Sequence, residues 1–435
     1  MTICILLGRL IPLPCVNSSF SPKLFSYYLD HEGGIMKNGL KILPWFILLL
    51  LIAAPFITPV SSSAVEPLVI GVPHSEAYPY AAMMKNSFEM ALEVINKEGG
   101  IKGQPIELVY ADDQGKPKPG EKAVIDLVEK NSALMLVGGY QSSNTIFMAR
   151  IVDKLDRPFL VCTAADDRIT QRKWKNVYRL NPPAKGYTSG LEKFFLSEIK
   201  PKSMAIVYEN SPYGTSGAMR MMWFCRGNNI DLRAIEPYHK ERLSADYFNR
   251  VVARMKKDPP DVIYMVSYLN DGAVLAKNIR DAKIDSLLVG GAGGFTSQKF
   301  IDKAGDDANN LLTATLWTPQ LKYPGIKEYY DQYTEKYASA PDYHGAEAYS
   351  ALMVAADVLK RADSFSPESI RAALDQTDMM TPFGPVKFIS YENFERQNRL
   401  PTQVLQILNG KFECVWPQEL ATANFTAPPE WKVND

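Results

Sequence analysis

Short apolar runs alternate with amphipathic stretches along the chain from residue 68 to about residue 317. In the stretch Ala81–Lys97, apolar residues recur every three or four positions, which predicts a helix with one buried face. These residues are Met84, Phe88, Leu92 and Ile95. The flanking runs LVIGV and IELVY are continuously apolar, which is typical of strands whose sheet is covered by helices on both faces. The segment therefore predicts the opening βαβ unit of an open α/β sheet.

The alternation occurs twice. A first series of strands and helices ends at PFLVC, and the pattern restarts after YRLNPPAKGY with SMAIVY and ends with LLTATLW. We interpret the two series as two Rossmann-like lobes of the same architecture. The tail begins with helices around Ile326–Tyr337, Tyr343–Arg361 and Pro367–Asp375. It continues with VKFI and then with two apolar runs around Asn409-Gly410, a strong signal for a two-residue β-hairpin turn.

This pattern predicts a chain that crosses between the lobes three times, near 181–187, 316–319 and 381–385. Lobe 1 would comprise residues 65–182 and 317–383, and lobe 2 residues 183–316 and 384–420. Residues 421–435 would form a C-terminal tail.

The N-terminus has the features of a secretion signal. Lys37 and Lys41 follow Met36, an apolar core runs from Ile42 to Ile57, and small residues precede a cleavage site expected after Ala64. The core is shorter than the ~20 residues that span a bilayer, although an uncleaved anchor is the alternative. We therefore expect residues 36–64 to be a signal peptide, residues 1–35 to be a start-site artefact, and the mature protein to be periplasmic.

Composition narrows the function. The chain has 48 basic and 48 acidic residues and no basic stripe, which argues against nucleic acid as a partner. Four histidines and five cysteines lack metal-ligand spacing, so we expect no metal and no cofactor. GGAGG after SLLV lacks the Lys-Ser/Thr ending of a phosphate loop, and Asp112-Asp113 has no histidine near it in sequence. The sequence therefore does not predict an enzyme.

Five segments together resemble the leucine/isoleucine/valine-binding proteins, the type I periplasmic solute-binding proteins of ABC importers. The segments are EVINKEGGIKGQPIELVYADD, LVGGYQSSNT, FLVCTAAD, AIVYENSPYGTSGA and VIYMVSY. The resemblance covers residues 68–417 and implies two α/β lobes joined by a hinge of three crossovers. It also implies capture of an amino acid or related small carboxylate, delivery to an inner-membrane ABC permease, and a monomer.

The resemblance places ligand-binding positions in two loops of lobe 1. Ser142 matches the serine that binds the ligand's carboxylate, and Gln141 precedes it. A serine at a helix N-terminus is an anion site on physical grounds too, although a plain helix cap is equally consistent. Ala164 and Ala165 match backbone contacts.

Asp166 stands where the family has a threonine. It could meet a ligand ammonium, cap a helix or pair with Arg168. The family's lobe 2 acid for the ammonium is replaced by Ala292. Either Asp166 takes its role, or the ligand is not an α-amino acid.

Tyrosines complete the predicted site. Tyr80, Tyr213 and Tyr268 match aromatic positions around the cleft, where a ring supplies apolar area and a polar group at low entropy cost. Two other functions remain open at this point: a ligand-sensing module that feeds a membrane signalling receptor, and a secreted α/β enzyme.

Overall fold

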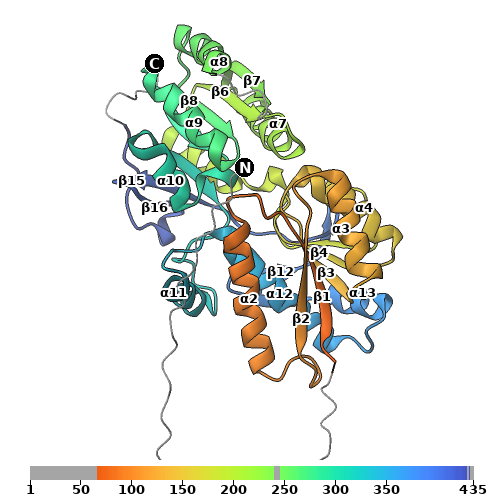
Figure 1. Ribbon diagram of the computed structural model, residues 1–435. Coiled ribbons are helices and arrows are strands. Elements are labelled where there is room, and N and C mark those ends of the chain that lie inside the picture. The colour runs from red at the N-terminus through yellow and green to blue at the C-terminus, as the bar shows by residue number, and fades with distance from the viewer. Residues whose placement is uncertain (1–65, 240–244, 429–430, 432–435) are drawn as a thin grey trace, which may run out of the picture. The chain divides into compact units, whose positions relative to one another are not determined.

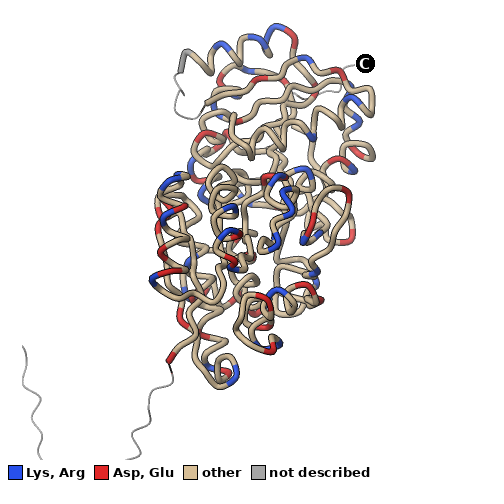
Figure 2. Tube along the Cα trace, turned by 90° about the vertical axis from the view of Figure 1, so that its right-hand side faces the viewer, with Lys and Arg blue, Asp and Glu red and all other residues tan. Residues whose placement is uncertain are grey.

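The computed structural model describes residues 66–239, 245–428 and 431. The predicted signal peptide and the segment 1–35 lie outside these residues. Within the described residues, no helix combines the length and the apolar character that a membrane span requires. Acidic and basic residues are interspersed along the chain (Figure 2).

The first lobe is built on a seven-stranded sheet of order β13-β14-β5-β4-β3-β1-β2. Five of its strands are β1 (Leu68–His74), β2 (Ile106–Asp112), β3 (Met135–Gly138), β4 (Phe159–Val161) and β5 (Val177–Arg179). They are parallel to one another. Its helices are α2 (Ala81–Lys97), α3 (Pro117–Glu129), α4 (Ser142–Lys154) and α5 (Arg168–Gln171).

Helices cover both faces of this sheet, as the continuously apolar strands predict. In β3, Met135 and Val137 belong to the core formed with α2 and the later helix α12, whereas Leu136 belongs to the core under α3 and α4 (Figure 1). The predicted stripe on α2 is correct: Met84, Phe88 and Ile95 are buried and Leu92 packs against the same core.

The second lobe repeats this plan with the order β16-β15-β10-β9-β8-β6-β7. Its strands are β6 (Ser203–Glu209), β7 (Asp231–Tyr238), β8 (Val262–Val266), β9 (Leu287–Gly290), β10 (Leu312–Thr315), β15 (Gln403–Leu408) and β16 (Lys411–Trp416). Its helical elements are η1 (Ala184–Gly186), α6 (Ser189–Phe194), η2 (Phe195–Ile199), α7 (Pro212–Gly227), α8 (Ala245–Lys257), α9 (Leu269–Asp281), η4 (Gly293–Phe295), α10 (Gln298–Ala304) and η5 (Gly305–Ala308). The predicted hairpin at Asn409-Gly410 is confirmed, with both residues at positive φ between the antiparallel strands β15 and β16.

The tail returns to the first lobe before it crosses back. It comprises α11 (Ile326–Tyr337), α12 (Tyr343–Arg361), α13 (Pro367–Asp375), β11 (Asp378–Thr381), β12 (Gly384–Lys387), β13 (Ile389–Tyr391) and β14 (Phe394–Gln397), and η6 (Gln418–Leu420) follows β16. The strands β11 and β12 form a separate hairpin. The strand β14 pairs with β5 of the first sheet, and β13 pairs with β14.

The predicted third crossing at 381–385 is therefore wrong, and so is the assignment of residues 384–397 to lobe 2. The chain leaves the first sheet for the last time between Gln397, the end of β14, and Gln403, the start of β15. Phe394 and Gln397 are buried at the β5 edge of the first sheet. An alternating apolar pattern predicts a strand, but it does not say which sheet edge that strand joins.

Candidate ligand-binding site

A small cavity lies where the carboxyl ends of strands from both sheets face each other. Ligands of open α/β sheets bind at such ends, where the strand order reverses. Residues after β3 and β4 and at the start of α12 line it from the first lobe, and residues after β6, β8 and β9 from the second. The lining residues are Tyr140, Ser142, Thr163, Ala165, Tyr187, Tyr213, Tyr268, Gly293, Tyr343 and His344.

Ser142 is the first residue of α4 and is almost fully buried at the cavity. Its Oγ accepts hydrogen bonds from the backbone N–H of Ala165 at 3.1 Å and of Asp166 at 3.0 Å. With its oxygen engaged in this way, the hydroxyl hydrogen remains to be donated. The serine thus ties two strand-end loops together and offers a donor beside the N-terminus of α4, where negative charge is stabilised.

Tyrosines from both lobes form the walls. The ring of Tyr268 lies 5.4 Å from that of Tyr213 and 6.3 Å from that of Tyr140 in the opposite lobe. Tyr187 lies 6.3 Å from Tyr213 and 6.4 Å from Tyr343. These tilted and edge-on arrangements are the ones that aromatic rings prefer. The cavity therefore presents a mostly apolar surface with a few polar tips.

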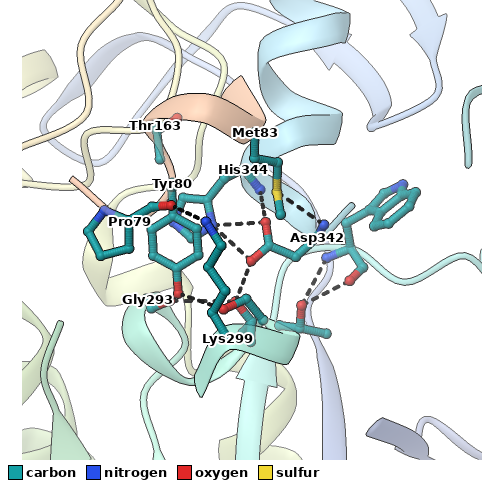
Figure 3. A network of polar contacts seen from close by, with 12 residues as sticks. Pro79, Tyr80, Met83, Thr163, Gly293, Lys299, Asp342 and His344 are labelled. Carbon is teal, nitrogen blue, oxygen red and sulfur yellow. Dashed lines mark hydrogen bonds and ion pairs between the residues drawn. The ribbon is translucent and has the colours of Figure 1, made fainter. Parts of the chain in front are cut away.

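His344 occupies an unusual position at the edge of the cavity (Figure 3). Its ring is stacked between Tyr80, with centroids 3.8 Å apart, and Tyr343, at 3.9 Å. Its Nδ1 lies 3.0 and 3.1 Å from the two carboxylate oxygens of Asp342, which also caps α12 by accepting from the His344 backbone N–H. The carboxylate favours the tautomer with hydrogen on Nδ1.

Three polar contacts join the lobes beside this histidine (Figure 3). The Tyr80 hydroxyl donates to the Gly293 carbonyl at 3.1 Å, and the Thr296 hydroxyl donates to Asp342 at 3.2 Å. Lys299 Nζ donates to the Pro79 carbonyl at 2.9 Å. Tyr80 itself packs into the core of the second lobe. These contacts form only when the two lobes are together.

The loop after β9 has an unusual backbone conformation at two consecutive residues. Ala292 has φ 63° and ψ −141°, a conformation that costs a residue with a Cβ about 1–3 kcal/mol. The next residue, Gly293, also has positive φ, and a Cβ there would collide with the Tyr213 hydroxyl. The strained turn aims the Gly293 carbonyl at Tyr80. Such strain is concentrated at ligand clamps.

Asp166 is fully buried, and its carboxylate is engaged locally. It accepts hydrogen bonds from the Arg168 backbone N–H at 2.9 Å and from the Arg168 guanidinium at 2.7–3.1 Å. The ion pair raises the pKa of Arg168. Of the roles that the sequence left open, the structure shows the local pair with Arg168, and Asp166 is not among the residues that line the cavity.

A second buried acid, which the sequence did not single out, lies one helical turn after His344. Glu347 on α12 has no solvent exposure, and neither carboxylate oxygen has a hydrogen-bond partner. The nearby Thr163 hydroxyl donates to Cys162 Sγ at 3.4 Å. Burial raises the pKa of Glu347 well above its usual value. It does not belong to the cavity lining either.

Four of the nine predicted site residues line the cavity: Ser142, Ala165, Tyr213 and Tyr268. The other five lie next to it. Gln141 precedes α4 with its side-chain oxygen buried and unpartnered, Ala164 supports Arg179 through its carbonyl, and Tyr80, Asp166 and Ala292 have the positions given above.

Sequence reasoning missed six lining residues, and some could have been found from their position. Tyr140 and Thr163 lie in the two loops already chosen, and Tyr187 ends a predicted crossing. Tyr343 and His344 follow Asp342, a residue type that favours helix starts, at the beginning of a predicted helix. No sequence signal connects that distant helix with the loop after β3.

Comparison with known proteins agrees with this geometry. The sequence model of a family described as periplasmic binding protein matches residues 70–411. The chain belongs to this family. Its members are solute-binding proteins rather than enzymes, and their place is extracytoplasmic. The predicted resemblance to leucine/isoleucine/valine-binding proteins and the predicted two-lobed fold are confirmed.

Relatives of this periplasmic binding protein differ in their ligands. It is 26% identical over 410 residues to the Leu/Ile/Val-binding protein homolog 8 of Brucella suis biovar 1, covering 86% of this chain and 97% of that one. The branched-chain amino acid transporter substrate-binding protein LivJ of Streptococcus pneumoniae, in complex with isoleucine, has a TM-score of 0.73 and 21% identity, covering 81% and 100%. A solute-binding protein of Rhodopseudomonas palustris, in complex with 3,4-dihydroxybenzoic acid, has a TM-score of 0.69 and 15% identity, covering 80% and 95%. The shared fold thus holds both amino acids and aromatic acids.

Proposed function

We propose that this protein is the extracytoplasmic solute-binding component of an ABC importer. It captures an amino acid or a related small carboxylate between two closing lobes and delivers it to an inner-membrane permease. Cleavage of a signal peptide near Ala64 would release it into the periplasm. One observation supports this proposal above all: residues at the strand ends of both lobes line the same small cavity.

The lining supports carboxylate binding. The Ser142 hydroxyl can donate to an anion beside the N-terminus of α4, and the tyrosines of both lobes supply apolar contact area. A ligand that touches both lobes favours the closed state by the difference between its contacts in the closed and open states. A micromolar Kd needs about −8 kcal/mol, within reach of a few charge-assisted hydrogen bonds and aromatic burial.

The test has two parts. Isothermal titration with amino acids and small organic acids should find a ligand, and small-angle scattering should show that saturating ligand compacts the protein. Ser142→Ala should weaken binding by about tenfold because a charge-assisted hydrogen bond is lost. Ser143→Ala, one residue further on the same helix, is the matched control and should bind as the wild type does. An unchanged radius at saturation would contradict closure, and unchanged affinity of Ser142→Ala would contradict the placement of the anion.

A further inference from the structure

The cavity is asymmetric in charge. Among the described residues that line it, His344 is the side chain that can carry a positive charge, and none is a carboxylate. Five of the lining residues are tyrosines, and a sixth tyrosine, Tyr80, stacks on His344 next to the lining. The five are Tyr140, Tyr187, Tyr213, Tyr268 and Tyr343. An enclosed anion therefore finds hydrogen-bond donors in this wall, whereas an enclosed cation finds no counter-charge.

The contacts of His344 determine how it meets a ligand. Tyr80 and Tyr343 cover the two faces of its ring, and the Asp342 carboxylate holds Nδ1. The free edge, which carries Nε2, is the part of the ring left to contact the cavity. A protonated imidazole donates from both nitrogens, so Nε2 can donate to a carboxylate while Nδ1 donates to Asp342. Together with the Ser142 hydroxyl, this gives an anion two donors from two different elements of the first lobe.

Three acids near the cavity are not available to an ammonium group. The Asp166 carboxylate is bound by Arg168, and the Asp342 carboxylate is bound by His344 and Thr296. Glu347 lies outside the lining, and burial favours its neutral form. In the second lobe, Ala292 occupies the position where the family resemblance would place an acid for the ligand's ammonium. Burying an ammonium without a paired charge costs several kcal/mol, which exceeds what apolar contact with one side chain returns.

We propose that the ligand is a small monocarboxylate with an apolar or aromatic body and no ammonium group, and that His344 and Ser142 bind its carboxylate. This inference rests on the proposed function and narrows it. It assigns His344 as a ligand-binding residue that selects for a negatively charged ligand.

Matched ligands that differ only in the ammonium group test the charge rule. The pairs are 3-phenylpropanoate with phenylalanine and 4-methylpentanoate with leucine. In titrations of the wild-type protein, the deaminated acid should bind at least about tenfold more tightly than its amino acid in any pair that binds. Equal or tighter binding of the amino acid would overturn the inference and leave the proposed function intact.

The role of His344 is tested with the variant His344→Gln and with 3-phenylpropanamide, the neutral amide of the first acid. The wild type should prefer the acid to the amide, and the variant should lose most of that preference, about tenfold, while its affinity for the amide stays nearly unchanged. A merely structural histidine would weaken acid and amide equally, which would overturn the assignment. His239→Gln is the matched control, because His239 is exposed and its ring nitrogen lies 3.3 Å from Asn210, away from the cavity lining.

Failure of the inference and failure of the proposed function are distinguishable. If neither pair binds but another solute binds and compacts the protein, the charge inference fails and the proposed function stands. If no amino acid or small acid binds, both fail.

Discussion

Tyr80→Phe isolates the contribution of lobe closure to ligand affinity. The hydroxyl of Tyr80 donates across the lobes to the Gly293 carbonyl at 3.1 Å and accepts from Ser297 Oγ at 3.4 Å. Phenylalanine keeps the ring that stacks on His344 and removes the hydroxyl that makes these contacts. In an open state the same hydroxyl would be bound to water, so the substitution destabilises the closed state selectively.

The expected effect follows from the strength of such contacts. A neutral hydrogen bond contributes about 0.5–1.5 kcal/mol net, and the second contact, at 3.4 Å, is weak. Because ligand affinity includes the free energy of closure, the Kd should rise roughly twofold to tenfold. The melting temperature of the ligand-free protein should change little, because its folding does not require the lobes to close.

Tyr329→Phe is the matched control. Its hydroxyl lies 2.9 Å from Ser87 Oγ, is similarly buried, and joins α11 to α2 within the first lobe. Losing this bond should lower the free energy of unfolding by about 0.5–1.5 kcal/mol and leave the Kd unchanged. Isothermal titration and calorimetric unfolding of both variants give the comparison. Wild-type affinity in Tyr80→Phe, or an equal loss in Tyr329→Phe, would refute the reasoning that the Tyr80 contact acts through closure.

Three further predictions concern stability and use the melting temperature of the ligand-free protein. Asp166→Asn weakens the buried pair with Arg168 and should cost about 1–3 kcal/mol without a selective loss of ligand affinity; weaker binding at unchanged stability would instead place Asp166 at the ligand. Ala292→Gly removes the strain of a positive φ and should raise stability by about 1 kcal/mol, and a lower melting temperature would show that the turn is unstrained. Burial raises the pKa of Glu347, so its folded form holds a proton that the unfolded form loses near pH 4.5, and stability falls as pH rises above that value. Glu347→Gln removes this loss and should be more stabilising at pH 8 than at pH 4.5; an equal effect at both would contradict it.

The local elements could be predicted from the sequence because burial repeats with the period of each element. The helix Ala81–Lys97, the hairpin at Asn409-Gly410 and the alternation of strand and helix in each lobe all follow from that rule. Ser142, Tyr213 and Tyr268 were chosen from the family resemblance, and their places in the fold are consistent with it. Each lies just beyond a buried strand, and parallel strands place their carboxyl ends along one edge of the sheet.

Contacts between distant segments were not predictable in this way. The strands β13 and β14 could join either lobe, and only the free edge beside β5 decided it. The sequence left three roles open for Asp166, and the backbone turn at α5 brings its carboxylate to Arg168.

The sequence by itself thus determined two repeated α/β lobes and the strand-end loops that carry part of the site. Only the tertiary structure decided that the start of α12 brings His344 beside those loops, stacked between two tyrosines and held by Asp342. The reason is physical. Periodicity in the sequence shows which face of a helix or strand is buried. The element that covers this face depends on packing between segments about 200 residues apart, and no local pattern encodes such a contact.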